Sequence, residues 1–169
     1  MKALLSAYRH EDVMPWARLF VAHGIELIAT QGTMRALEAS GIPVESSASL
    51  TGFASRLSGG IKTIHPAIHE AMATGEIGYV VVGLMPIDDP TSPGLESMDL
   101  GGVLLLRSAV KRHEVCCPLC CPSPHIADVQ HVLEGMADHR TVSRVCAVHA
   151  MHEVIAYEKA TLARLLAMQ

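Results

Sequence analysis

A chain of 169 residues, half of them apolar, is long enough to bury a core without disulfides or bound metals. Aromatic residues make up only 4% of the chain, so the core must consist mainly of aliphatic side chains and methionine. The net charge of −4, with no basic stripe, argues against a nucleic-acid partner, although two or three cations in one pocket can still bind a small anion.

The apolar segments are too short for a signal peptide or a membrane span. The N-terminal run MKALL is brief, whereas a spanning helix needs about 20 apolar residues. We therefore expect a cytoplasmic protein without membrane contact. The chain has five cysteines, and an odd count in a reducing compartment argues against a disulfide framework.

The first thirty residues predict a strand, a helix and a second strand. Short apolar runs at residues 2–7 and 26–30 are typical of buried strands. Between them, residues 13–23 place apolar side chains at helical spacing, and Gly24 follows where a helix C-cap would lie.

Helices and strands continue to alternate along the rest of the chain. The run at residues 79–84 is apolar on both faces, as expected for the centre of a parallel sheet. No internal repeat or low-complexity linker interrupts the pattern. Residues 1–169 are therefore predicted to form one α/β domain, a three-layer doubly wound parallel sheet with C-terminal helices and its site at the carboxyl ends of the strands. Further helices are predicted at 33–40, 68–74, 103–112, 127–136 and 142–168, and further strands near residue 44 and at 115–121.

Three segments have residue types suited to chemistry. Ala29-Thr30-Gln31-Gly32-Thr33 joins a predicted strand to a helix, so its hydroxyls and backbone N–H groups can hold a phosphate, although such a turn is more often a plain N-cap. In Gly59-Gly60-Ile61-Lys62-Thr63, two glycines allow the backbone to come close to a ligand, and a lysine cation follows them. The alternative is a surface loop with a solvated lysine. Asp99, before two glycines, either caps the following helix or acts as an acid/base group.

Taken in order, these segments resemble the IMP cyclohydrolase domain of the bifunctional AICAR transformylase/IMP cyclohydrolase family. The resemblance runs from about residue 2 to the final helix. It rests most strongly on the K-T-x-H-P block and on the D-x-G-G…L-R-x-A-x-K-x-H block. The matching segments are Leu4–Ser6, Ala29–Thr33, Thr51–Phe53, Ile61–Pro66, Asp99–Gly102 and Leu106–His113.

The resemblance implies a methylglyoxal synthase-like fold and a cofactor-free reaction. In that reaction 5-formamidoimidazole-4-carboxamide ribotide (FAICAR) closes to IMP with loss of water, so the expected partner is a purine ribotide. Neither a metal nor an organic cofactor is implied. The transformylase domain of the family has no counterpart in these 169 residues, so no folate chemistry is expected from them.

The resemblance also implies roles for individual residues. Lys62 would stabilise the developing oxyanion, while Asp99 and Lys111 would manage protons and orient the carboxamide. On a straight helix, however, Asp99 and Lys111 would lie about 18 Å apart. The residues expected to bind the ribotide and its phosphate are Ser6, His10, Thr30, Gly32, Thr33, Thr63, Gly101 and Gly102.

The chain departs from the family pattern on the reacting side of the pocket. Gly83 and Met85 stand where the family has an asparagine and a tyrosine, and we expect them to form a pocket wall. Gly60 replaces an arginine, and His10 replaces a lysine. These changes leave two alternatives open: cyclisation of an analogous phosphoribosyl heterocycle in a specialised nucleoside pathway, or nucleotide binding without catalysis. Methylglyoxal synthase ranks lower, because no G-D-x-Q-type segment is present.

Two further features stay open at the level of sequence. Cys117-Pro-Leu-Cys120, within the cluster from Cys116 to Cys121, has the spacing of a zinc knuckle. A closed zinc site usually needs a second ligand pair, and a predicted core strand favours packed thiols, so we expect no metal. The family is commonly dimeric, but its transformylase domain supplies much of that contact, so a homodimer is neither predicted nor excluded.

Overall fold

The computed structural model describes residues 1–52, 62–88 and 95–168 of the chain. At its centre lies a five-stranded sheet in the order β3-β2-β1-β4-β5, with every neighbouring pair parallel. This arrangement confirms the predicted α/β fold. The strands are β1 (Lys2–Ala7), β2 (Glu26–Ala29), β3 (Glu45–Ser46), β4 (Ile77–Gly83) and β5 (Cys117–Cys121).

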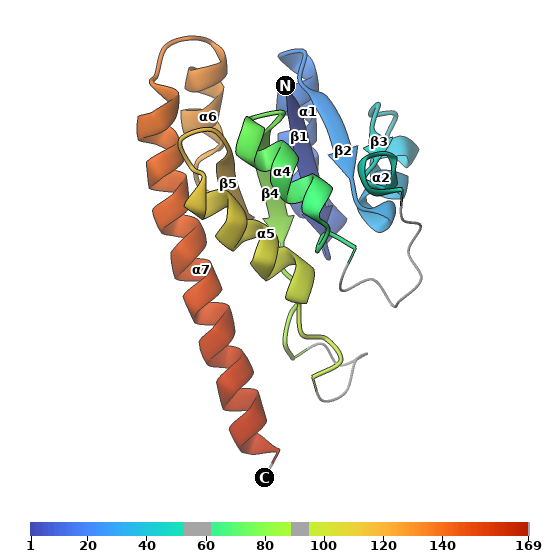
Figure 1. The fold of residues 1–169 in the computed structure, drawn as a ribbon, viewed down its shortest axis with the longest axis vertical. Coiled ribbons are helices and arrows are strands. Elements are labelled where there is room, and N and C mark those ends of the chain that lie inside the picture. Colours follow the sequence, from blue (N-terminus) through green and yellow to red (C-terminus); the bar gives the residue numbers. More distant parts are fainter. Residues whose placement is uncertain (53–61, 89–94, 169) are drawn as a thin grey trace.

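Helices cover both faces of the sheet and give the molecule three layers (Figure 1). Side chains of α1, α2 and α6 pack on one face, and side chains of α4 and α5 pack on the other. The helices are η1 (His10–Val13, a 3-10 turn), α1 (Met14–Ala22), α2 (Gln31–Ala39), α3 (Ala48–Thr51), α4 (Pro66–Thr74), α5 (Leu100–Lys111), α6 (Ile126–Leu133) and α7 (His139–Ala167).

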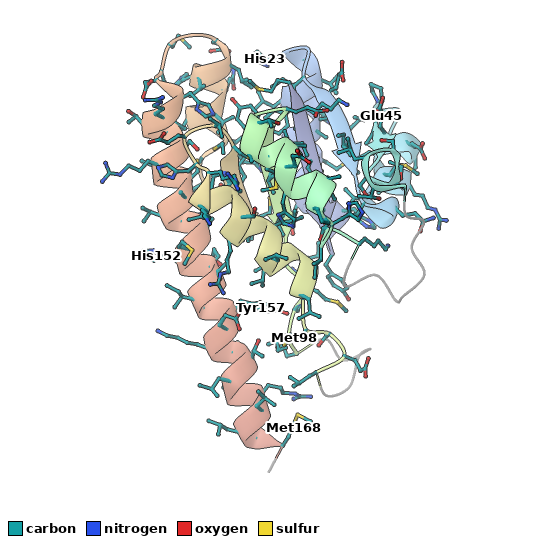
Figure 2. All side chains as sticks on the ribbon, in the orientation of Figure 1. His23, Glu45, Met98, His152, Tyr157 and Met168 are labelled. Carbon is teal, nitrogen blue, oxygen red and sulfur yellow. The ribbon has the colours of Figure 1, made fainter. Side chains whose placement is uncertain are left out.

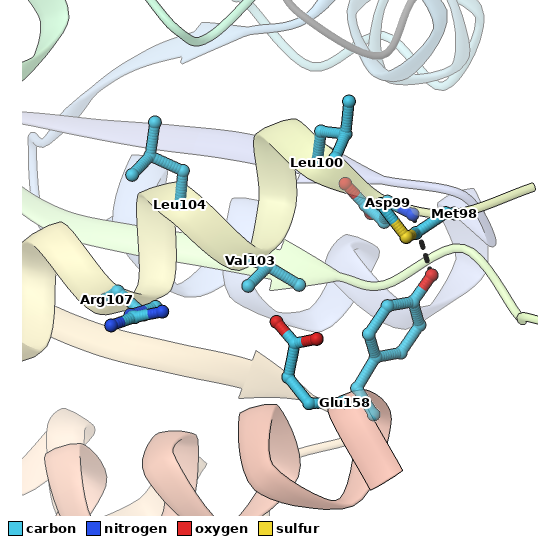
Figure 3. A pocket seen from close by; sticks show the side chains of 8 residues that line it. Met98, Asp99, Leu100, Val103, Leu104, Arg107 and Glu158 are labelled. Atoms are coloured by element: carbon cyan, nitrogen blue, oxygen red, sulfur yellow. Dashed lines mark hydrogen bonds between the residues drawn. The ribbon is translucent and has the colours of Figure 1, made fainter. Parts of the chain in front are cut away.

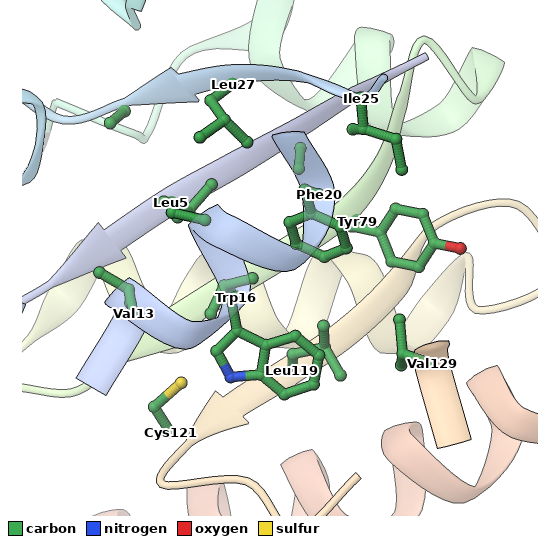
Figure 4. Close-up of a cluster of buried hydrophobic side chains, with 14 of the residues drawn as sticks. Leu5, Val13, Trp16, Phe20, Ile25, Leu27, Tyr79, Leu119, Cys121 and Val129 are labelled. Carbon is green, nitrogen blue, oxygen red and sulfur yellow. The ribbon is translucent and has the colours of Figure 1, made fainter. Parts of the chain in front are cut away.

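Alternation along the strands divides the core into two clusters. In β4, Tyr79 and Val81 face the α1 side, whereas Val80 and Val82 face the α4–α5 side. The α1 side collects Trp16 and Phe20 against Tyr79, and the Phe20 and Tyr79 rings have centroids 4.9 Å apart (Figure 4). Three aromatic residues, Trp16, Phe20 and Tyr79, thus lie in one cluster, while the buried members of the opposite cluster are aliphatic residues with one methionine and two cysteines.

The long helix α7 covers the β5 edge of the sheet (Figure 1). Cys146 joins the cluster on the α1 side, and Ala150 and Val154 join the cluster on the α4–α5 side. An exposed strand edge can pair with another chain, so a covering helix protects it. The C-terminal turns of α7 continue past the sheet. No helix of the described ranges is both long enough and apolar enough to span a bilayer.

The predicted element boundaries are correct to within a few residues, and capping explains the main differences. α5 begins at Leu100 rather than at residue 103, because Asp99 caps it. α4 begins at Pro66 rather than at residue 68, because the side chain of His65 accepts a hydrogen bond from the Ala67 N–H. β5 starts two residues late, because the N–H groups of residues 115 and 116 both donate to the Arg112 carbonyl in a turn.

Candidate functional site

The order of the strands indicates where a ligand would bind. The chain passes from β1 to β2 and β3 on one side, whereas β4 and β5 lie on the other side of β1. Open α/β sheets bind ligands at the carboxyl ends of the strands that flank such a switch point. The two strands that flank the switch point, β1 and β4, end at Ala7 and Gly83. The Tyr8 N–H donates a hydrogen bond of 3.0 Å to the Gly83 carbonyl and joins these two ends.

Three hydroxyl groups gather at the carboxyl end of β1. The Thr30 Oγ1 atom lies 3.4 Å from Ser6 Oγ and 3.3 Å from Thr33 Oγ1. Thr33 is buried, and its hydroxyl accepts a hydrogen bond of 3.0 Å from the Ala7 N–H, which ties α2 to β1. Ser6 and Thr30 are half-buried, so their hydroxyls remain accessible to a ligand.

The N-terminus of α2 opens onto the same hydroxyls. Thr30 is its N-cap residue with an extended backbone, and the first N–H groups of any helix have no partner within that helix. A Cβ atom at Gly32 would lie 3.3 Å from His10 Nε2, so the glycine allows the imidazole to approach the helix terminus. Ser6, His10, Thr30, Gly32 and Thr33, all predicted from sequence, are therefore brought together. This set is suited to a phosphate group.

The lysine predicted to act on the oxyanion lies ahead of α4. Because α4 leads into the amino end of β4, its own N-terminus lies on the carboxyl side of the sheet, as do the half-buried Lys62 and the buried Thr63. Gly59, Gly60 and Ile61, together with Phe53, lie outside the described residues. Position along the fold is thus consistent with a shared site for Lys62 and the hydroxyl cluster.

Asp99 holds the backbone on the other side of the switch point. Its Oδ1 atom accepts a hydrogen bond of 2.6 Å from the Gly102 N–H and so caps α5. Its Oδ2 atom accepts a hydrogen bond of 3.1 Å from the Met85 N–H, which fixes the segment that follows β4. The carboxylate therefore anchors two chain segments, and the capping role considered from sequence is confirmed.

A phenol that the sequence did not single out supports Asp99 from α7. The Tyr157 hydroxyl accepts a hydrogen bond of 2.7 Å from the Asp99 N–H (Figure 3). Met98, Asp99 and Tyr157 line a small pocket between α5 and α7, with a volume of about 200 Å³. The sequence feature that could have identified Tyr157 is its helical spacing from Ala150 and Val154, which places the tyrosine on the core-facing side of α7.

The glycines on this side are required by close packing. A Cβ atom at Gly102 would lie 2.7 Å from Asp99 Oδ2 and 2.9 Å from Val82 Cγ1. A Cβ atom at Gly83 would lie 3.0 Å from the Ala7 Cβ. Gly101 and Gly102 are both buried in the first turn of α5. A side chain at position 83 would therefore require Ala7 to shift by a few tenths of an ångström.

Lys111 lies at the opposite end of α5 from Asp99. The helix rises about 1.5 Å per residue, which places the two residues about 18 Å apart along its axis. Lys111 instead lines an open cleft of about 590 Å³ between α4 and α5, together with Arg107, His65 and His69. The structure thus separates Lys111 from the Asp99 carboxylate of its own chain.

His69 is half-buried in this cleft. Its Nδ1 atom lies 2.9 Å from Ser108 Oγ. Burial lowers the pKa of His69, more than a hydrogen bond to the Thr63 backbone raises it. Arg107 and Lys111 contribute two basic side chains to the cleft.

The cysteines are packed as protonated thiols. Cys117 faces the α1 side of the sheet and Cys120 the α4–α5 side, so the two side chains of the knuckle-like pair point in opposite directions. Burial raises the pKa of Cys116, Cys120 and Cys121 to about 12. Within the described ranges, no three His, Cys, Asp or Glu side chains are placed to hold a metal ion.

Comparisons with known proteins agree with the fold described above. The family described as MGS-like domain matches residues 12–119. The bifunctional purine biosynthesis protein PurH of Halalkalibacterium halodurans is 32% identical over 165 residues, which cover 84% of this chain and 32% of the relative. PurH of Rhodospirillum rubrum is 35% identical over 157 residues, which cover 80% of this chain and 29% of the relative.

A solved structure covers nearly the whole chain. The crystal structure of ForH matches with a TM-score of 0.78 and 26% sequence identity, over 98% of this chain and 98% of that chain. By contrast, this chain spans about a third of the length of the curated relatives that it matches.

Proposed function

Since this chain belongs to the MGS-like domain family and is related to the cyclohydrolase domain of PurH, we propose that it closes the ring of FAICAR or of a closely similar ribotide. The observation that carries the proposal is the cluster of Ser6, His10, Thr30 and Gly32 at the N-terminus of α2. A helix N-terminus with hydroxyls and an imidazole suits a phosphate monoester.

The reaction requires positioning more than strong chemical catalysis. The carboxamide nitrogen attacks the formyl carbon, and a C–N bond forms. The formyl oxygen then leaves as water, with one proton from the carboxamide and one from the formamido N–H. Holding both groups in contact lowers the barrier, because the reaction is intramolecular and the amide is a poor nucleophile.

Lys62 is the residue proposed to stabilise the oxyanion. A fixed ammonium group beside the former formyl oxygen would stabilise the negative charge that develops during attack. Removing one such group commonly costs about a hundred- to a thousand-fold in kcat. The turn that holds Lys62 precedes α4 on the carboxyl side of the sheet, where the ribotide would bind.

Asp99 is proposed to orient the carboxamide while it anchors the pocket wall. A carboxylate offers about four lone-pair positions, and two are used by the Gly102 and Met85 N–H groups. A remaining position can accept an N–H from the substrate carboxamide. Lys111 takes no part in this proposed step, because it lies at the other end of α5 from Asp99.

A second candidate function is nucleotide binding without turnover, or turnover of a different heterocycle. It is favoured by Gly83 and Met85, which replace the amide and phenol of the resembling family. In that case the cluster at the N-terminus of α2 would still bind the phosphate of ribotides. The segment from Gly83 to Met85 would then select another base or provide no catalysis.

Purified protein incubated with FAICAR in the presence of a chelator tests these alternatives. We expect IMP to form, and Lys62→Ala to lower kcat by about a hundred-fold or more. Arg18→Ala, an exposed cation on α1, serves as the matched control and should retain full activity. Tight IMP binding without turnover would favour the second candidate. Neither binding nor turnover would reject both.

A further inference from the structure

Helices α4 and α5 lie side by side on one face of the sheet, and His69 joins them (Figure 1). The Nδ1 atom of His69, on α4, lies 2.9 Å from the Oγ atom of Ser108, near the end of α5. His69 comes about one turn after His65, the N-cap residue of α4, so the first half of that helix makes the contact. The start of α4 is thereby fixed relative to α5.

The same imidazole also contacts the turn that leads into α4. Thr63 is buried in this turn, and its backbone forms a hydrogen bond with His69. Because Nδ1 faces Ser108, the bond to Thr63 falls to Nε2, a buried atom that has no other partner. In a neutral imidazole one nitrogen donates and the other accepts. In that form, Nε2–H donates to the Thr63 carbonyl and Nδ1 accepts from the Ser108 hydroxyl.

Lys62 depends on this turn for its position. It is half-buried and directly precedes Thr63. Among residues 1–52, 62–88 and 95–168, no carboxylate forms an ion pair with its ammonium group. Since the stem of a lysine side chain is flexible, the backbone of the turn decides which region the ammonium group can reach.

We propose that His69 is a positioning residue for the ring closure, because it holds the turn of Lys62 and Thr63 against α5 and so places the ammonium group beside the oxyanion. This inference rests on the proposed function, in which Lys62 stabilises that charge. A displacement of about 1 Å can cost roughly a hundred-fold in rate. Both ring nitrogens face groups of the protein, so His69 acts through Lys62 and takes no proton from the ribotide.

Two amide substitutions separate the two contacts of the ring. In His69→Gln, the amide nitrogen reaches about as far as Nε2 and can still donate to the Thr63 carbonyl. In His69→Asn, the shorter side chain can reach Ser108 but not Thr63. With FAICAR as substrate, His69→Asn should lower kcat roughly ten- to a hundred-fold with KM little changed, whereas His69→Gln should stay within about three-fold of the wild type. Equal losses in the two variants would mean that His69 only packs, and would overturn the proposal.

Combination with Lys62→Ala tests whether His69 acts through the lysine. In the Lys62→Ala variant, His69→Asn should cause no further loss of kcat, because the group that His69 positions is gone. Losses that multiply would show independent roles and contradict the inference.

His23→Asn is the matched control. His23 is also half-buried and also makes a hydrogen bond through Nδ1, at 2.9 Å from the Leu19 carbonyl. It lies at the opposite end of the molecule from Met98, which precedes Asp99 (Figure 2). This variant should retain full activity, so a similar loss of kcat in His23→Asn would remove the special role of His69.

Hydrogen exchange tests the structural part of the proposal without turnover. Mass spectrometry should show faster amide exchange at residues 62–68 in His69→Asn than in the wild type or His69→Gln, with exchange in β4 unchanged. If the wild type closes no ring but His69→Asn shows this local change, the proposed function fails while His69 still holds the turn. Unchanged exchange at residues 62–68 would overturn the inference, whatever the activity.

Discussion

The two sides of the switch point use their polar groups differently. On the β1–β2 side, the hydroxyls of Ser6 and Thr30 contact each other and remain accessible beside the N-terminus of α2. On the β4–α5 side, both oxygens of Asp99 accept hydrogen bonds from the backbone of Gly102 and Met85. One side leaves its hydroxyls beside a helix N-terminus, whereas the other uses its carboxylate to hold two segments of its own chain in place.

This difference indicates where the domain can diverge. A phosphate group is the same in every ribotide, so the β1–β2 side can stay unchanged while substrates vary. The heterocycle would meet the Gly83–Met85 segment, whose position depends on Asp99. A change of base can thus follow from side chains on that segment without any change in phosphate binding.

The largest expected effect comes from placing a negative charge on the β1–β2 side, where we propose that the phosphate binds. Gly32→Asp would put a carboxylate at the N-terminus of α2, close to His10. Repulsion of the phosphate should weaken IMP binding by about a hundred-fold or more, because the site loses its preference for anions. Isothermal titration calorimetry measures this directly.

The isosteric variant Gly32→Asn separates charge from size. It adds the same volume beside the imidazole but no charge, so its loss of affinity should be clearly smaller. Equal losses for the two variants would mean that crowding, rather than anion binding, explains the glycine. The proposal that this side binds the phosphate would then be wrong.

A smaller effect is expected on the other side, and it should appear in stability. Asp99→Ala removes the cap of α5 and the acceptor for the Met85 N–H. We expect the free energy of unfolding to fall by about 2–3 kcal/mol, which corresponds to a melting temperature lower by roughly 4–10 °C. Differential scanning calorimetry is the appropriate measurement.

Asp99→Asn should lie between the wild type and the alanine variant. Its amide oxygen can still accept the Gly102 N–H, but its NH₂ group cannot accept the Met85 N–H. IMP affinity should fall less in either variant than in Gly32→Asp, because Asp99 is proposed to contact the base and not the phosphate. Unchanged stability in Asp99→Ala would show that the carboxylate is not an anchor.

The sequence predicted that the residues of the β1–β2 side lie together, because most of them are local. Ala29-Thr30-Gln31-Gly32-Thr33 joins one strand to one helix, so its geometry follows from the order of two elements. The distance between Asp99 and Lys111 was also predictable, since a continuous helix fixes it. Of the segments quoted for the family resemblance, those that contain Ser6, Thr30 and Thr33 meet at the carboxyl end of β1, whereas Lys111 lies at the far end of α5 from Asp99.

The β4–α5 side could not be predicted in the same way. The close approach of Gly83 to Ala7 depends on β1 and β4 being neighbours in the sheet. The hydrogen bond between Tyr157 and Asp99 joins residues 58 positions apart and depends on how α7 packs along β5 and α5. Neither contact leaves a local pattern in the sequence.

Tyr157→Phe should have the smallest effect, and it tests whether α7 supports this side. The variant keeps the ring but loses the acceptor for the Asp99 N–H, which is worth about 1 kcal/mol. Thermal unfolding should show a small decrease, and Tyr157→Leu a larger one, because that change also loses ring packing. IMP affinity should stay the same in both, since the proposed phosphate contacts lie across β1. If Tyr157→Phe instead weakened IMP binding as strongly as Gly32→Asp, the two sides would be energetically coupled, and the division between a ligand-binding side and a self-supporting side would not hold.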